Sequence, residues 1–213
     1  MQLVGMLDSP YMRRVAVALI AAKVPFEHRP ISLFRHVDAF SLINPLLKAP
    51  TLVADDATVL IDSTLILDYL ACLHPAVAAM TPAAPAERLI ALRATGLALA
   101  VMEKAVQRHY ERALRPPEKL HAPWVDRIMA QLNAGLQALD RELPRAGWVG
   151  RDLGHADIAA ACACSFAAGT IGDVVDVARY PNLAAFAARA EALPAFRAAP
   201  ARDGVTAPVA LAD

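Results

Sequence analysis

With 213 residues, of which 57% are hydrophobic and 20% charged, the chain is long enough for two small domains and too apolar for intrinsic disorder. Its 21 basic and 21 acidic side chains balance, so we expect no surface for nucleic acid or for an anionic membrane. The N-terminal stretch lacks the pattern of a secretion signal, and no apolar run is long enough to span a membrane. Three cysteines make no disulfide framework, which together with these features predicts a cytoplasmic protein.

The first 80 residues alternate between strand-like and helix-like patterns. In the segment 10–23, apolar residues recur at the i, i+3, i+4 and i+7 spacing of one helical face. The predicted strands are 2–7, 26–31, 51–54 and 58–61, and the predicted helices are 10–23, 34–43 and 63–73. The order strand, helix, strand, helix, strand, strand, helix predicts a small α/β domain over residues 1–80.

The composition changes at residues 74–87, where three prolines exclude a continuous helix and indicate a linker. Beyond it, strand patterns are absent. The predicted helices are 86–114, 123–142, 155–168, 181–191 and 194–199. The sequence therefore predicts α/β plus all-α architecture, with a helical-bundle domain over residues 86–213.

The common sequence motifs of phosphate-binding, metal-binding and redox sites are missing. No glycine-rich phosphate loop, HExxH or CxxC occurs, and the six histidines are scattered, so we expect no metal site. One polar segment that could carry function is "SPYMRR", directly after the first predicted strand. Ser9 followed by Pro10 is typical of a helix start. A serine that caps a helix accepts a backbone hydrogen bond, and its own proton stays available to another group.

A second segment, "IDST", opens the helix predicted at 63–73. The N–H groups of a helix start favour a carboxylate or phosphate. Ser63 adds a hydroxyl donor and Asp62 an acceptor for an ammonium group, although helix capping alone also explains both residues. A third segment is "KAP", in which Lys48 suits a second carboxylate and Ala49 offers its backbone to a peptide. A cis peptide bond before Pro50 would turn the backbone of Ala49 outward, toward such a peptide.

Together these segments resemble the glutathione transferase family, which has a thioredoxin-like N-terminal domain and a helical C-terminal domain. "SPYMRRVAVAL" is similar to the family's first turn and helix, "NPLLKAPTLV" to its "NPxGKVPxLV", and "LIDSTLILDYL" to its "LxESxxIxxYL". In the second half, "GWVGRDLGHADIAAACA" (147–163) is similar to "FLxGxxxSxADI". The resemblance covers nearly the whole chain, with the motifs in the family's order.

The resemblance implies that the ligand is glutathione, γ-Glu-Cys-Gly, used as a co-substrate without a metal. The Ala49–Pro50 bond is then cis and Ala49 pairs with the cysteinyl backbone, while Lys48 meets the glycyl carboxylate. Ser63 holds the γ-glutamyl carboxylate and Asp62 faces its ammonium. Ser9 points at the sulfur, with Tyr11 as its rival for activating the thiol.

The family further implies a homodimer and a hydrophobic electrophile held against the helical domain. The pocket candidates are Tyr11, Met12, Phe34, Met102, His109 and Tyr110. This chain departs from the family pattern at Leu47, which replaces a glycine, at Ala49, which replaces a valine, and at Asp62, which replaces a glutamate. Gly154 stands where the family has a serine or threonine cap, so Asp157 reads as a folding residue.

Two other functions stay open. The same fold carries glutathione-dependent thiol transfer or peroxidase chemistry, which usually calls for cysteine where this chain has Ser9. It also occurs in non-catalytic interaction and regulatory proteins, which tend to lose the glutathione-binding residues that are present here.

Overall fold

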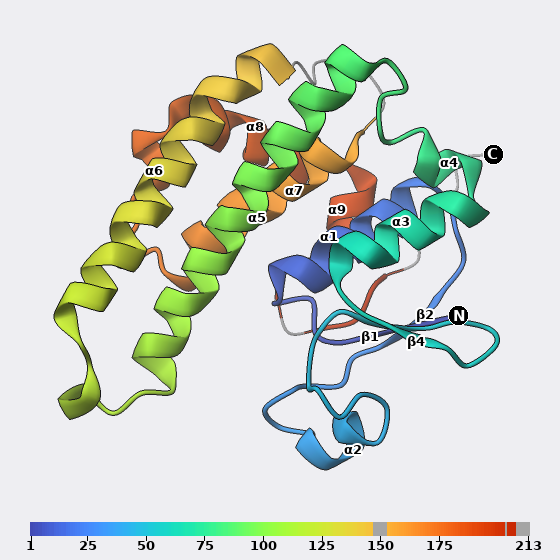
Figure 1. The fold of residues 1–213 in the computed structure, drawn as a ribbon, viewed down its shortest axis with the longest axis horizontal. Coiled ribbons are helices and arrows are strands. Elements are labelled where there is room, and N and C mark those ends of the chain that lie inside the picture. The colour runs from blue at the N-terminus through green and yellow to red at the C-terminus, as the bar shows by residue number, and fades with distance from the viewer. Residues whose placement is uncertain (147–152, 203, 208–213) are drawn as a thin grey trace. The chain divides into compact units, whose positions relative to one another are not determined.

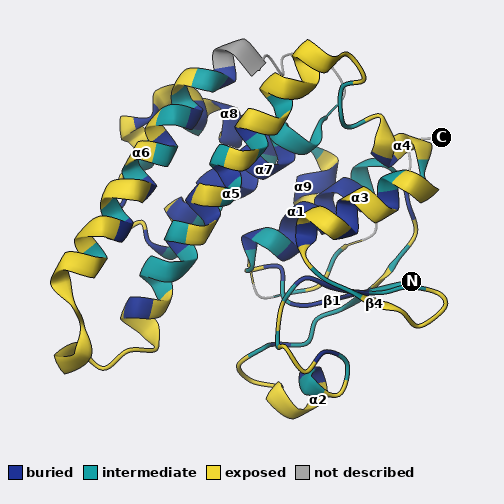
Figure 2. Cartoon of the chain, in the orientation of Figure 1, coloured by how far each residue is buried: buried dark blue, intermediate teal, exposed yellow. Residues whose placement is uncertain are grey.

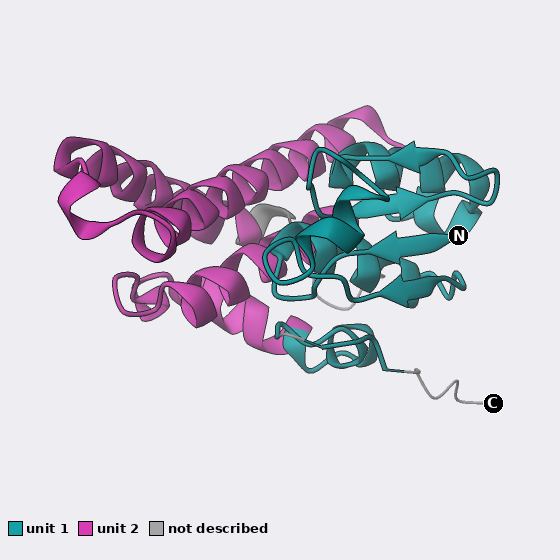
Figure 3. Ribbon diagram, turned by 90° about the horizontal axis from the view of Figure 1, so that it is seen from below, with its two compact units in different colours: residues 1–81, 191–213 teal, residues 82–190 magenta. Residues whose placement is uncertain are grey.

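The computed structural model describes residues 1–146, 153–202 and 204–207 (Figure 1). It divides into two compact units, coloured separately in Figure 3. Unit 1 comprises Met1–Thr81 and Glu191–Asp213, and unit 2 comprises Pro82–Ala190. The first boundary falls inside the predicted linker. The C-terminal segment, however, groups with the N-terminal unit, whereas the sequence pattern placed it with the helical domain.

Unit 1 is built on a four-stranded sheet in the order β2-β1-β3-β4. Strand β1 pairs in parallel with β2 and antiparallel with β3, which in turn pairs antiparallel with β4. The strands are β1 (Gln2–Val4), β2 (Glu27–Arg29), β3 (Thr51–Val53) and β4 (Val59–Leu60). They are shorter than predicted because an apolar pattern reports burial rather than strand pairing. Leu7, for example, is fully buried beyond the end of β1.

The helices of unit 1 lie on both sides of this sheet (Figure 1). α1 and α3 lie over one face, with α9 packed against α1, and α2 lies on the other side. These helices are α1 (Pro10–Ala21), α2 (Val37–Ser41), α3 (Ser63–Leu73), α4 (Pro75–Ala78) and α9 (Pro194–Ala198). The predicted order of strands and helices is confirmed, and it is that of a thioredoxin-like domain. The short helix α4, inside the predicted linker, was not expected.

A buried arginine explains why the C-terminal segment belongs to unit 1. Helix α1 is buried along most of its length (Figure 2), and its Arg13 is 1% exposed. The guanidinium of Arg13 makes a two-point ion pair with Glu191, at 2.5 and 2.6 Å. It also donates to the carbonyl oxygen of Ala199 at 2.7 Å and lies over the ring of Phe196. α1 therefore holds both Glu191 and α9.

Unit 2 is helical throughout its described part. Its helices are α5 (Pro85–Ala113), α6 (Ala122–Ala146), α7 (His155–Thr170) and α8 (Pro181–Glu191), with short 3-10 turns at Pro117–Lys119 and Val177–Arg179. α5 packs against both α6 and α7. The α6 residues Ile128, Leu132, Leu136 and Leu139 are fully buried at the spacing that its sequence predicts. No described helix has the length and apolar composition needed to cross a membrane.

Helix α7 begins where the fourth family-like motif predicts. Gly154 is its N-cap, and the Asp157 carboxylate accepts a hydrogen bond from the Gly154 N–H at 2.8 Å. Glycine has no side chain to return such a bond, so the capping box is only half formed. Asp157 therefore stabilises the start of α7, the structural role that the sequence predicts for it. The first six residues of that motif, 147–152, lie outside the described residues.

His28 ties the C-terminal segment to the sheet through hydrogen bonds of both its ring nitrogens. Its Nδ1 accepts from the N–H of Thr206 at 3.1 Å, so its Nε2 carries the proton and donates to the carbonyl oxygen of Gly5 at 2.9 Å. Burial lowers the pKa of His28 from the ordinary 6.5, and the bond to Gly5 opposes this shift only in part. The lowered pKa and the bond from Thr206 to Nδ1 both favour the neutral imidazole.

We expect the free energy of unfolding to fall as the pH drops below about 6.5, since the unfolded chain then takes up a proton that the folded chain resists. The loss ends once the pH passes the lowered pKa of the folded state. Urea unfolding between pH 5 and 8 of the wild type and of His28→Gln measures this contribution. An identical pH dependence in both proteins would show that His28 does not cause it.

Candidate functional site

The sheet register brings two of the predicted site segments to one end of unit 1. Val4, the last residue of β1, pairs with Thr51, the first residue of β3. Because the two strands are antiparallel, the loop after β1 and the residues before β3 meet at the same edge. Gly5 and Ala49 touch there: a Cβ built on Gly5 would lie 2.9 Å from the Cβ of Ala49. The segment containing Ser9 therefore passes beside the segment containing Pro50.

The Ala49–Pro50 peptide bond is cis, which confirms the prediction, and Ile61–Asp62 is also cis. A buried polar network supports the turn that leads to Lys48. Asn44 donates to the Thr51 hydroxyl at 2.9 Å, and that hydroxyl donates to the carbonyl oxygen of Lys48 at 2.6 Å.

Leu47 lies in the left-handed region, with φ 49°. That is the conformation for which the family's glycine is suited. The turn therefore places a leucine in a backbone conformation that suits glycine.

Ser9 lies at the N-cap of α1. Its Oγ accepts from the backbone N–H of Met12 at 3.3 Å, and Pro10 follows as the first helical residue. The cap predicted from the sequence is confirmed. Since the hydroxyl acts as an acceptor toward Met12, its own proton is available to an acceptor beyond the helix end.

The N-terminus of α3 is held by α1 rather than standing alone. Asp62 is the N-cap, and its carboxylate accepts from the N–H of Thr64 at 2.7 Å. Ser63 is 1% exposed, and its Oγ accepts from Nη1 of the buried Arg14 at 3.2 Å. The same Nη1 donates to the hydroxyl of Thr64, also at 3.2 Å. Ser63 thus turns its hydroxyl inward, while Asp62 and Thr64 are exposed.

The three segments together present complementary groups at one end of unit 1. Lys48 and Asp62 are exposed and opposite in charge, and Ala49 is half-buried between a buried proline and the β1–α1 loop. Two helix N-termini, those of α1 and α3, supply N–H groups and favour negative charge. A zwitterionic peptide with a thiol has the matching chemistry: two carboxylates, one ammonium and one group that gains from becoming an anion.

The pocket candidates divide between the units. Tyr11, Met12 and Phe34 belong to unit 1, whereas the others lie on α5 in unit 2, where the rings of His109 and Tyr110 are 5.9 Å apart between centroids. Met12 and Met102 have no exposed surface, so both serve as core residues in the structure. Phe34 and Tyr110 are exposed, and Tyr11 and His109 are half-buried.

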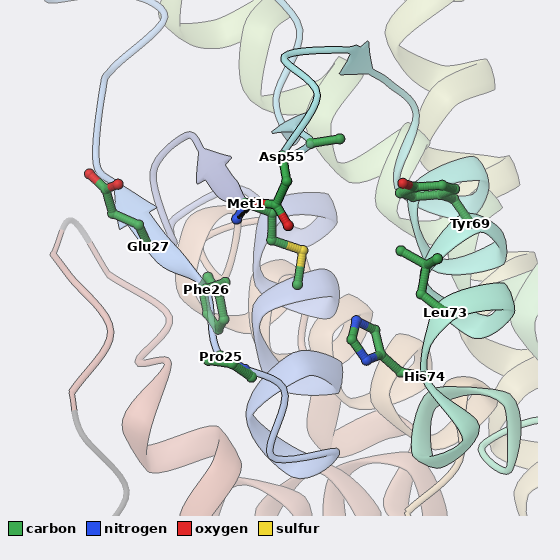
Figure 4. Close-up of a pocket in the computed structure, with 9 residues that line it drawn as sticks. Met1, Pro25, Phe26, Glu27, Asp55, Tyr69, Leu73 and His74 are labelled. Carbon is green, nitrogen blue, oxygen red and sulfur yellow. Dashed lines mark hydrogen bonds and ion pairs between the residues drawn. The ribbon is translucent and has the colours of Figure 1, made fainter.

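A hollow of about 740 Å³ lies elsewhere in unit 1 (Figure 4). Phe26 and Pro25 line one side, Tyr69, Leu73 and His74 line the other, and Met1 lies between them. Ala54, Asp55 and Glu27 complete it, and the terminal ammonium of Met1 pairs with Asp55 at 2.5 Å. Met1 directly precedes β1, and Tyr69, Leu73 and His74 lie at the end of α3 or directly after it. The hollow is therefore at the other end of both elements from Ser9 and Ser63, and contains none of the predicted site residues. Among the described residues, no cluster of His, Cys, Asp and Glu is suited to a metal ion.

Sequence reasoning missed four residues that shape the site: Gly5, Arg14, Asn44 and Thr64. Thr64 had a visible signal, a second hydroxyl in the first turn of a predicted helix. Asn44 stands in the quoted "NPLLKAPTLV", but only the fold shows that its side chain reaches Thr51. Gly5 and Arg14 act through contacts with distant parts of the chain, which a single sequence does not reveal.

The close approach of Gly5 to Ala49 can be tested by substitution. Its φ is +140°, and an added Cβ would also lie 3.3 Å from the sulfur of Met12. We expect Gly5→Ala to lower stability by about 2 kcal/mol, since strain and overpacking combine. The control is Gly96→Ala, an exposed position in α5 where a Cβ meets nothing within 4 Å, which should raise stability by about 0.5–1 kcal/mol. Urea unfolding measures both, and equal effects would contradict the tight contact at Gly5.

Comparison with known proteins shows the family to which the chain belongs. The model of the glutathione S-transferase N-terminal domain matches residues 3–78, and the model of the C-terminal domain matches residues 122–189. The chain therefore belongs to the glutathione S-transferase family. YibF of Escherichia coli K12, described as an uncharacterized GST-like protein, is 28% identical over 166 residues, which are 78% of this chain and 81% of YibF.

Solved structures of the family share the fold along almost the whole chain. A glutathione S-transferase from Methylobacterium radiotolerans, in complex with glutathione sulfonate, is 29% identical with a TM-score of 0.83, covering 98% of this chain and 99% of its own. One from Methylobacillus flagellatus, with glutathione bound, is 26% identical with a TM-score of 0.83, covering 93% and 98%.

Proposed function

We propose that this protein is a serine-type glutathione transferase, which binds glutathione in unit 1, stabilises its thiolate and conjugates it to a hydrophobic electrophile. The observation that carries the proposal is the meeting of the Ser9 loop with Ala49 at the same end of unit 1 as the N-terminus of α3. Structures 26–29% identical to this chain hold glutathione or its sulfonate, which supports the same ligand here.

In the proposed complex, each part of glutathione meets a group of matching chemistry. Ala49 pairs with the cysteinyl backbone, Lys48 meets the glycyl carboxylate, and Asp62 faces the γ-glutamyl ammonium. The γ-glutamyl carboxylate binds at the start of α3, where the inward turn of Ser63 assigns the exposed hydroxyl contact to Thr64. Ser9 donates to the sulfur.

Calorimetric titration with glutathione tests the proposal against its main alternative, a non-catalytic interaction protein of the same fold. Binding at or below millimolar glutathione, followed by conjugation of a model aromatic electrophile, is the expected result. Absence of binding at millimolar glutathione would favour the interaction protein. Reduction of a mixed disulfide or of a peroxide without conjugation would favour the thiol transferase or peroxidase.

Asp62 is expected to contribute through its charge. Asp62→Ala should weaken glutathione binding by roughly 1.5–3 kcal/mol, since the ammonium loses a charge-assisted partner. Asp62→Asn should weaken it similarly while keeping an oxygen for the N–H of Thr64, whereas the alanine variant also loses about 1 kcal/mol of stability through the cap.

Lys48→Ala, at an exposed position, should cost about 1 kcal/mol of binding or less. Titration of the three variants beside thermal unfolding separates these effects. Unchanged affinity in both Asp62 variants would show that the tripeptide binds in another orientation.

For the electrophile, we propose contacts from the accessible candidates Tyr11 and Phe34 of unit 1 and His109 and Tyr110 of unit 2, whereas Met12 and Met102 lie in the cores of their own units. We also propose a cytoplasmic homodimer. α3 exposes Leu65, Tyr69 and Leu73 at helical spacing, which gives a second copy an apolar face to cover. Sedimentation of the wild type and of Leu65→Glu should show a dimer and a weakened dimer, respectively.

A further inference from the structure

A buried cation lies at the start of α3, and the proposed function does not yet use it. Arg14 of α1 is 2% exposed. Its Nη1 donates to the hydroxyls of Ser63 and Thr64, two consecutive residues in the first turn of α3. Arg14 therefore holds both hydroxyls in place from the side of α1.

The same contacts also determine whether each hydroxyl accepts or donates a hydrogen bond toward Arg14. A guanidinium has no acceptor, so both hydroxyls act as acceptors toward Arg14 and keep their own protons for other groups. Thr64 is exposed, so its proton is available to a ligand at the surface. The dipole of α3 favours an anion at the same place.

We propose that Arg14 is a positioning residue for the γ-glutamyl α-carboxylate of glutathione. Through its hydrogen bond to Thr64 it holds that hydroxyl as a donor at the helix start. Ser63 takes part through its backbone, since its hydroxyl is buried and turned toward Arg14. This inference rests on the proposed function because it takes glutathione as the ligand.

The test compares two ligands that differ only in that carboxylate. Glutathione and γ-aminobutyryl-cysteinyl-glycine, which lacks the α-carboxylate, are titrated into the wild type and into Arg14→Met, the analogue by competition where its binding is weak. We expect the variant to raise the Kd of glutathione about tenfold and that of the analogue less than about twofold. A purely structural role would weaken both ligands alike, and that result would overturn the inference.

Two further variants keep the test decisive if Arg14→Met does not fold. Arg14→Lys retains an N–H donor in place of the guanidinium and should bind glutathione within about threefold of the wild type. Thr64→Val leaves Arg14 in place and should weaken glutathione more than the analogue. Arg93→Met, at an exposed ion pair of unit 2, is the control and should change neither Kd.

The outcomes separate this inference from the proposed function. If the wild type does not bind glutathione, the proposed function fails and the inference fails with it. If the wild type binds glutathione but none of the Arg14 and Thr64 variants discriminates between the two ligands, only the inference is overturned.

Discussion

Arg13→Met is expected to lower the free energy of unfolding by about 3 kcal/mol, because it removes one partner of a largely buried ion pair. The arginine is nearly inaccessible, and it donates to Glu191 as well as to the carbonyl oxygens of Ala199 and Phe196. Methionine fills much of the volume but satisfies none of these acceptors. Glu191 is 36% exposed, so water recovers part of its loss, which keeps the estimate at the lower end of the range for buried pairs.

The matched control is Arg93→Met. Arg93 pairs with Glu142 at 3.0 Å, but its side chain is 60% exposed, so its loss should cost less than about 1 kcal/mol. Urea unfolding of the two variants gives the comparison, and limited proteolysis should cut Arg13→Met earlier within the C-terminal segment. Equal costs for the two variants would contradict the role assigned to Arg13 in holding Glu191 and α9 to α1.

The order of elements could be predicted because it depends on local patterns. The helical spacing in 10–23 and the alternation of strands and helices up to residue 73 follow from which side chains must be buried, and burial is what periodicity reports. The start of α7 was also predictable, since Gly154 and Asp157 lie three residues apart in one motif. The ends of the strands could not be predicted, because apolar residues such as Leu7 stay buried beyond the last paired residue of a strand.

The grouping of the C-terminal segment with unit 1 could not be predicted from one sequence. Two adjacent arginines on a helix normally indicate a solvent-exposed face. Here Arg13 and Arg14 are buried because their partners come from far away, 178 residues along the chain for Glu191 and 49 for Ser63. Such partners leave no signal in the spacing of nearby residues.

The candidate site was predictable in part for the same reason. Ser9, Asp62 and the cis bond before Pro50 follow from short motifs, the last of them only through the family resemblance. The support beneath them, from Gly5 and Arg14, depends on how β1, α1 and α3 meet. The electrophile candidates are the least constrained, since no motif fixes which side chains line such a pocket, and two of them proved to be core residues.

Ser9→Ala is expected to raise the pKa of the bound thiol and to cut turnover at least about tenfold near pH 7, with glutathione affinity nearly unchanged. A free thiol has a pKa near 8.5 and is only about 3% ionised at pH 7. Lowering that pKa by two units requires about 2.7 kcal/mol of preferential stabilisation of the thiolate. A hydroxyl hydrogen bond to an anion supplies roughly 1.5–3 kcal/mol, and the N-terminus of α1 adds about 0.3–1 kcal/mol. These two contributions suffice without a general base.

The geometry of Ser9 allows this role and also requires a control. Its Oγ accepts from the N–H of Met12, so the hydroxyl proton is free for the sulfur, but alanine would also remove the helix cap at a cost of about 1 kcal/mol of stability. Ser9→Gly removes the hydroxyl with a capping loss of only a few tenths of a kcal/mol. If loss of the hydrogen bond to sulfur is the cause, both variants should shift the pH–rate profile equally.

Tyr11→Phe decides between the two candidate donors. Tyr11 lies two residues after Ser9, in the first turn of α1, and is half-buried. We expect its variant to keep the wild-type thiol pKa, measured from the thiolate absorbance of bound glutathione across pH, and to change turnover by less than either Ser9 variant does. A shifted pKa in Tyr11→Phe together with an unshifted one in Ser9→Gly would assign the thiol to the tyrosine. Ser9 would then be a helix cap and nothing more, since the energy that lowers the thiol pKa would come from another hydroxyl.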